Sequence, residues 1–277
     1  MKVKITVLVD DRSERSDLLS EHGLSIWVET DLWNILFDTG QTDAFFKNAD
    51  RLKIPVRQVD HIILSHGHYD HTGGIPEISD LIGKARIHIH PDALSLRYRR
   101  CEKIPHKAVG MRPSTAFRLL DAHYFVDWTR APIEIEKQIY LTGSIPRRHK
   151  LEKNNSSFFF DPGCTIPDRI VDDQALFIQS GKGLIVFLGC AHAGVMNTLD
   201  FICEWTGSSK VYAVIGGMHL LNADWHRLET TAEALARFRV KYLLPCHCTG
   251  NDAIEILENK LPGHVVSCST GTSMVLG

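Results

Sequence analysis

The chain has 277 residues, of which 44% are hydrophobic and 23% are charged, a balance typical of a globular protein with a sizeable core. The formal net charge of -2 provides no basic field, so we expect neither nucleic acid nor an anionic membrane surface as a partner. Seven cysteines, an odd number, argue against a disulfide framework and predict a cytoplasmic protein, and no apolar run approaches the length of a membrane span.

The first third of the chain alternates between strands and short helices. Apolar residues at every second position predict strands, and apolar residues at three- and four-residue spacing predict helices. By these patterns the predicted strands span residues 2–9, 24–29, 33–37, 59–64 and 85–89, and the predicted helices span residues 42–53, 75–82 and 91–98.

Residues 99–167 are the least regular part of the chain, because prolines separate short strand-like pieces such as residues 117–120 and 138–141. A segment of this kind often covers a site as a lid or a specificity insert. A plain meander that completes the sheet is the alternative interpretation.

Regular patterns return near residue 174. The predicted strands there span residues 174–179, 184–188, 211–215, 241–244, 264–267 and 273–276, and the predicted helices span residues 195–205, 224–238 and 252–259. Residues 175–187 resemble residues 24–37, since each is a strand, a turn and a strand followed by a helix. Two such halves packed face to face predict a single domain over residues 1–277, with two sheets between layers of helices.

A run of metal-binding side chains follows the predicted strand at residues 59–64. It contains His66, His68, Asp70 and His71, and neutral imidazole and carboxylate are ligands that zinc, iron(II) and manganese prefer. If the two halves meet along one edge, histidines at later strand ends converge on this run; these are His192, His219 and His247. The pattern therefore indicates a site for two metals that share a hydroxide.

The run His66-x-His68-x-Asp70-His71, with Asp38-Thr39-Gly40 upstream, resembles the metallo-β-lactamase superfamily over essentially the whole chain. The resemblance implies an α/β fold, the four-layer αββα metallo-β-lactamase sandwich. Further motifs resemble the group around dihydropterin-methyl-ribofuranosylaminobenzene 5'-phosphate synthase within that superfamily. These motifs are Glu21–Ser25, Asp172–Leu176, Gly189–Gly194, Ile215–His219 and Pro245–Gly250.

The resemblance also implies a ligand set for two divalent metal ions, with zinc favoured and iron or manganese as alternatives. It assigns His66, His68 and His192 to the first metal. It assigns Asp70, His71 and His247 to the second metal. Asp38 resembles the carboxylate that orients the histidine loop from behind without binding metal.

The bridge between the two metals departs from the common pattern of the superfamily. Cys190 stands where many members carry an aspartate, and it is either a thiolate ligand or a small buried hydrophobic residue. Asp172 or Asp173 could supply the missing carboxylate, and a turn or a strand cap is the alternative role for these two residues.

Several further residues have two interpretations. His219 is a substrate contact with an acid–base role, a further metal ligand, or a structural residue. We expect His88 and His90 to form a solvated or capped face, and Cys246 and Cys248 to pack at a strand end. The basic run Arg147, Arg148, His149 and Lys150 offers an anion site, with a solvated turn as the alternative.

Two functions follow from these features. The first is a metal-dependent hydrolase that acts on a small, anionic, phosphorylated substrate through a metal-bound hydroxide, with Asp70 and His219 as catalytic residues. The second is a synthase-type transferase, in which pyrophosphate is displaced from a pterin-methyl diphosphate by an aminobenzene ribose phosphate. The sequence leaves the choice between them open, together with the oligomeric state.

Overall fold

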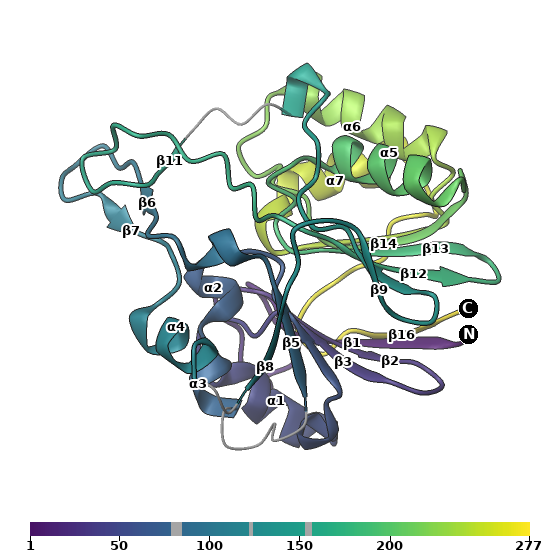
Figure 1. The fold of residues 1–277 in the computed structure, drawn as a ribbon. Helices are drawn as coiled ribbons and strands as arrows, with labels where there is room; N and C mark the ends of the chain where they lie inside the picture. The colour runs from purple at the N-terminus through teal and green to yellow at the C-terminus, as the bar shows by residue number, and fades with distance from the viewer. Residues whose placement is uncertain (79–84, 122–123, 153–156) are drawn as a thin grey trace.

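The computed structural model describes residues 1–78, 85–121, 124–152 and 157–277, and these form two mixed sheets packed face to face with helices on both outer sides (Figure 1). The first sheet has the strand order β16-β1-β2-β3-β4-β5-β8, and the second has the order β15-β14-β13-β12-β10-β9. This arrangement is the four-layer αββα sandwich that the sequence predicts.

The bounds of the strands are as follows. In the order just given, the first sheet contains Ser273–Leu276, Val3–Val9, Ser25–Glu29, Asn34–Phe37, His61–Ile63, Arg86–Ile89 and Phe125–Trp128. The second sheet contains Tyr242–Cys246, Val211–Gly217, Gly183–Leu188, Leu176–Ser180, Ile139–Leu141 and Ile133–Glu136. A small third sheet, β11-β6-β7, contains Phe158–Phe159, Tyr98–Arg99 and Lys107–Ala108.

The helices cover the two outer faces of the sandwich. They are α1 (Ala44–Leu52), α2 (Tyr69–Thr72), α3 (Ile75–Ile78), α4 (Pro113–Leu119), α5 (Val195–Thr206), α6 (Trp225–Arg237) and α7 (Asn251–Lys260). Single 3-10 turns occur at η1 (Val56–Gln58), η2 (Pro91–Leu94), η3 (Lys150–Glu152) and η4 (His247–Thr249). None of the helices in the described ranges is long and apolar enough to cross a membrane.

The central strands are apolar on both faces because each sheet is covered on both sides. In β3, Ile35 and Phe37 pack between the sheets, whereas Leu36 packs with the α1 residue Phe45 on the outer side. In β13, Ile185 and Phe187 point between the sheets, and alternate residues join the core under α5 and α6. The middle layer is therefore largely apolar and holds the two halves together.

The two halves repeat one another, as the sequence predicts. The antiparallel pair β2–β3 is followed by α1 and by β4, which pairs parallel to β3. The antiparallel pair β12–β13 is followed by α5 and by β14, which pairs parallel to β13. Strands β13, β14 and β15 run parallel to one another. Their carboxyl ends therefore lie at one edge of the sandwich, where the carboxyl end of β4 also lies.

Three predicted elements are wrong or reduced. The helix predicted at 91–98 is only the turn η2 followed by β6, because the Arg97 side chain is drawn inward to Asp168 and Asp172. Residues 117–120, predicted as a strand, belong largely to α4, which starts at Pro113 and buries Thr115 and Leu119 on one face. The strand predicted at 264–267 makes only a single bridge, from Val265 to Leu243.

The predicted helix at 75–82 lies partly outside the described residues, and its described part is α3. Residues 99–167 contribute strands to all three sheets. Strands β8, β9 and β10 extend the two large sheets, whereas β6, β7 and β11 form the small sheet that projects from the side of the sandwich (Figure 1). We refer to this small sheet, Tyr98–Arg99, Lys107–Ala108 and Phe158–Phe159, as the lid sheet.

Candidate metal centre

Histidines from both halves meet at the shared edge of the two large sheets. His66 and His68 lie on the loop that follows β4, and His71 lies on α2 directly after it. His192 follows β13, and His247 begins η4 at the end of β15. All five side chains are buried, so their ring nitrogens need partners inside the protein.

His66, His68 and His192 form the first cluster. His66 Nε2 lies 2.9 Å from His68 Nδ1, and His192 Nε2 lies 3.2 Å from the same atom. Burial lowers the pKa of all three imidazoles well below the usual value, and neighbouring positive charge contributes to the shift. The rings are therefore neutral, and their convergent lone pairs can hold one metal ion.

Asp70, His71 and His247 form the second cluster. His71 Nε2 lies 3.2 Å from His247 Nε2, and Asp70 Oδ2 lies 3.7 Å and 3.6 Å from these two nitrogens. The two clusters are adjacent, since the ring centroids of His66 and His71 are 4.3 Å apart. Asp70 thus occupies the position from which a carboxylate can reach the second metal position.

The outer nitrogens of three rings are held by oxygen acceptors. His71 Nδ1 lies 2.7 Å from Asp38 Oδ2, and His247 Nδ1 lies 2.6 Å from Asp11 Oδ1. His66 Nδ1 lies 2.9 Å from the Ser65 hydroxyl, which in turn donates to Asp38 Oδ2 over 2.7 Å. These acceptors favour a proton on Nδ1 of each ring, so that Nε2 is the nitrogen turned towards the cluster.

The donor set fits a pair of divalent metal ions. His68 Nε2 and His192 Nδ1 are buried without a hydrogen-bond partner in the described part of the chain, although such burial has a cost. The other nitrogen of each ring, His68 Nδ1 and His192 Nε2, points into the first cluster, where the two atoms lie 3.2 Å apart. Convergent lone pairs of neutral rings repel one another unless a cation lies between them, and two such groups of donors lie side by side.

Cys190 lies at the junction of the two clusters. Its Sγ atom is 3.2 Å from His71 Nε2, and it can share a metal with His66 and His71, with His192 and His219, or with His247 and Cys248. Burial raises the pKa of the Cys190 thiol well above the usual value when no metal is bound. A bound metal reverses this preference, because a coordinating thiol loses its proton.

Asp172 and Asp173 lie one layer behind the histidines. Asp172 Oδ2 accepts hydrogen bonds of 2.8 Å from the Gly67 amide and from Arg97, and Asp172 Oδ1 accepts a third bond of 2.6 Å from Arg97. Asp173 Oδ2 accepts from the Ala193 amide over 2.7 Å, and burial raises its pKa to about 6. Both carboxylates therefore brace the loops that carry His66, His68 and His192.

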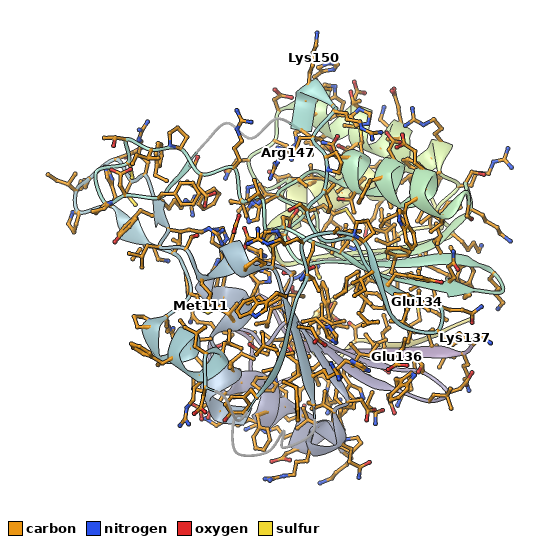
Figure 2. All side chains as sticks on the ribbon, in the orientation of Figure 1. Met111, Glu134, Glu136, Lys137, Arg147 and Lys150 are labelled. Carbon is orange, nitrogen blue, oxygen red and sulfur yellow. The ribbon has the colours of Figure 1, made fainter. Side chains whose placement is uncertain are left out.

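The basic run at residues 147–150 does not form the predicted anion site. Arg147 is largely buried and donates to the carbonyl oxygens of His192, Arg169 and Ile170. Arg148 pairs with Glu204 at 2.6 Å, and His149 pairs with Asp200 at 2.6 Å. Figure 2 shows Lys150 pointing outward at the upper tip of the molecule, with Arg147 set back from that tip. Arg147 thus supports the His192 loop.

Three further predicted residues are placed as follows. His219 has a left-handed backbone (φ 51°), and its ring lies 4.5 Å from the His192 ring, at the rim of the first cluster. The sequence predicts a solvated or capped face for His88 and His90. Both are buried, so the solvated form is wrong, whereas His90 Nδ1 does cap the turn η2 and His88 Nε2 lies 3.0 Å from His61 Nδ1.

A cavity of about 360 Å³ opens onto the two clusters. Asp11 and His22 line its floor, with His22 Nε2 3.3 Å from Asp70 Oδ2. Sequence reasoning missed both residues, although His22 belongs to a quoted motif and Asp11 follows the first strand. The walls add residues that carried no sequence signal; these are Arg99, Lys107, Phe158 and Arg227.

Comparisons with known proteins agree with this architecture. The profile of the metallo-beta-lactamase superfamily matches residues 21–136. The chain is 32% identical to the 7,8-dihydropterin-6-methyl-4-(beta-D-ribofuranosyl)-aminobenzene-5'-phosphate synthase of Methanocaldococcus jannaschii, over 90% of this chain and 88% of the synthase.

Solved structures give the same result. The crystal structure of Tm1679, a metal-dependent hydrolase of the beta-lactamase superfamily, superposes with a TM-score of 0.83 and 30% identity, covering 98% of each chain. The metallo-beta-lactamase fold protein YhfI from Bacillus subtilis superposes with a TM-score of 0.61 at 14% identity, over 99% of this chain and all of YhfI, and shares the fold. The chain belongs to the metallo-beta-lactamase superfamily.

Proposed function

We propose that the chain is a metal-dependent transferase that joins a pterin-methyl group to an aminobenzene ribose phosphate and releases pyrophosphate. The observation that carries this proposal is the likeness to the synthase of Methanocaldococcus jannaschii, which extends over 90% of the chain at 32% identity. The proposed ligands are His66, His68 and His192 for one metal and Asp70, His71 and His247 for the other, with zinc favoured.

The proposed reaction forms one bond and breaks one. The amino nitrogen of the aminobenzene attacks the methyl carbon of the pterin, and the carbon–oxygen bond to the diphosphate breaks with its electron pair on the departing oxygen. Bound metals would supply electrostatic stabilisation of that departing diphosphate. The attacking nitrogen then carries one proton too many, which a base in the cavity must accept.

His219 is our candidate for that base. It lines the cavity, is half-buried, and lies beside the first cluster without sharing the closest nitrogen contacts of that cluster. Asp70, at 3.3 Å from His22 Nε2, is placed to orient His22 as well as to reach the second metal position. Phe158 and His219, with ring centroids 6.3 Å apart, offer an aromatic wall against which planar substrates can pack.

A hydrolase is the second candidate function. It is supported by the full-length likeness to Tm1679, a metal-dependent hydrolase at 30% identity, and by the paired donor clusters, which suit the activation of a water molecule. In that reaction the nucleophile is water, and the substrate is a small phosphorylated molecule.

One experiment separates the two reactions. The metal-loaded protein is incubated with a pterin-methyl diphosphate, with and without the aminobenzene ribose phosphate, and pyrophosphate and the coupled product are measured together. Coupled product formed in step with pyrophosphate supports the transferase. Pyrophosphate or phosphate released at the same rate without the second substrate, and no coupled product, contradicts the transferase and supports the hydrolase.

A further inference from the structure

The lid sheet presents one row of side chains to the cavity. In its register Phe158 on β11 is opposite Arg99 on β6, and Arg99 is opposite Lys107 on β7. Residues directly opposite one another in antiparallel strands point to the same side of the sheet. All three side chains line the cavity that opens onto the metal centre, so the row faces the site.

The row begins at the metal centre and leads away from it. The Phe158 ring lies 4.8 Å from the His68 ring and 5.3 Å from the His192 ring. Neighbouring strands are about 4.8 Å apart, which puts Arg99 roughly 5 Å and Lys107 roughly 10 Å beyond Phe158 along the row. A substrate that reacts at the metals and packs on Phe158 therefore reaches the two cations with its far end.

Arg99 and Lys107 are like charges placed directly opposite one another, an arrangement that is unfavourable in a sheet. The Arg99 guanidinium makes no hydrogen bond or ion pair within the described residues, and the Lys107 ammonium lies 2.8 Å from the Tyr69 hydroxyl, a neutral partner. An anion between the two cations would relieve their repulsion and accept several charge-assisted hydrogen bonds.

The lid sheet is held in place against the metal-binding loop. The Tyr69 amide donates to the Val109 carbonyl oxygen over 3.1 Å, and His68 forms a bridge with Gly110. Directly before β6, the buried Arg97 bonds to Asp168 and Asp172. The row is thus fixed relative to the clusters, as a binding surface requires.

We infer that Phe158, Arg99 and Lys107 form a binding row for an aryl substrate that carries a phosphate at some distance from its ring. The ring packs on Phe158, and Arg99 and Lys107 hold the phosphate away from the metals. This inference rests on the proposed function, in which it assigns the row to the aminobenzene ribose phosphate and leaves the diphosphate of the pterin to the metals.

Binding of non-hydrolysable probes tests the row without requiring turnover. Calorimetry on the metal-loaded full chain compares 3-phenylpropylphosphonate, propylphosphonate and 3-phenylpropanol in the wild type and in the Arg99→Ala/Lys107→Ala and Phe158→Ala variants. We expect the double variant to bind both phosphonates roughly tenfold or more weakly, because charge-assisted hydrogen bonds are lost, and to bind the alcohol unchanged. Phe158→Ala should weaken only the two probes that carry a ring.

Lys103→Ala is the matched control, since Lys103 is an exposed lysine in the loop between β6 and β7 and does not line the cavity. It should leave all affinities unchanged. Three results would each overturn the inference. The double variant could bind 3-phenylpropylphosphonate as tightly as the wild type does, the wild type could fail to bind it, or Lys103→Ala could lose as much affinity as the double variant. Arg99→Gln and Lys107→Gln replace the alanines if the double variant does not fold.

The binding experiment and the coupling reaction test the row and the transferase proposal separately. If no coupled product forms but the cation variants still weaken the phosphonates, the row stands and the transferase fails. If the coupling reaction proceeds and the double variant binds every probe as the wild type does, the row fails and the transferase stands.

Discussion

At the scale of single residues, the orientation of each histidine decides what the site can do. His66, His71 and His247 each have one nitrogen held by an oxygen acceptor, and this leaves the other nitrogen free to bind a metal. Burial lowers the pKa of His247, but Cys248, Asp11 and Asp70 outweigh it and raise the pKa to about 10. A metal at this position must therefore displace a tightly held proton.

Cys190 is the residue whose role the sequence left open, and its sulfur lies 3.2 Å from His71 Nε2. We propose that the Cys190 thiolate is a metal ligand, and we therefore expect the cobalt-substituted protein to show a sulfur-to-cobalt charge-transfer band in the near ultraviolet. Cys190→Ser should remove this band, whereas Cys203→Ser, on α5, should retain it. A wild-type spectrum without the band would show that Cys190 is a packing residue.

At the scale of elements, the buried Arg97 joins the lid sheet to the metal-binding loop. It donates to Asp168 over 2.6 Å, to both oxygens of Asp172, and to the Asp92 carbonyl oxygen over 3.0 Å. Asp172 in turn holds the Gly67 amide between His66 and His68. The loop and the lid sheet are thus positioned by one ion-pair network.

Arg97→Ala should destabilise the protein by about 3–5 kcal/mol, because it leaves two buried carboxylates without their cation. Arg99→Ala, two residues further along the chain, removes an exposed guanidinium and should change the free energy of unfolding by less than about 0.5 kcal/mol. Urea unfolding of the two variants measures both values. Similar midpoints for the two would contradict this role of Arg97.

A separate polar contact lies between the two large sheets, where the side chain of His88 on β5 meets that of His61 on β4. Burial, His61 and Arg86, partly opposed by Asp127, lower the pKa of His88 to about 4. Burial lowers the pKa of His61 too, against the charges of Glu136 and Asp60. The folded state therefore takes up a proton at His88 less readily than the unfolded chain, whose histidines titrate near 6.5.

The sign of the pH dependence follows. The contribution of His88 to stability is complete above pH 6.5 and is lost as the pH falls from 6.5 towards 4, by roughly 3 kcal/mol at most. His88→Gln should therefore flatten the fall in the free energy of unfolding between pH 7 and pH 5. His226→Gln, on the exposed side of α6, should not change the slope. Parallel slopes for wild type and His88→Gln would contradict the assignment.

At the scale of the whole molecule, regular apolar patterns allowed the sandwich to be predicted. The strands at 3–9, 25–29, 34–37 and 183–188 alternate between an inter-sheet face and a helix-covered face, and this periodicity is visible in one sequence. The repeat of β2–β3 in β12–β13 indicated two halves, and strand ends then located the histidine clusters.

Features that depend on tertiary contacts were beyond prediction. The helix expected at 91–98 yields to the burial of Arg97, a contact with residues more than 70 positions away. The row of Phe158, Arg99 and Lys107 exists only through the register of strands two residues long. The basic run at 147–150 looked available for an anion in the sequence, because the acidic partners of Arg148 and His149 lie about 50 residues later, on α5. These partners are Glu204 and Asp200.

The central claim is that both halves of the chain contribute to two adjacent metal positions. Metal content per chain, measured on wild type, His192→Ala and His247→Ala after dialysis against limiting zinc, tests it most directly. We predict about two equivalents for the wild type and about one for each variant, because each substitution removes a proposed ligand from one cluster only. A wild type that retains no metal, or variants that retain as much metal as the wild type, would contradict the account.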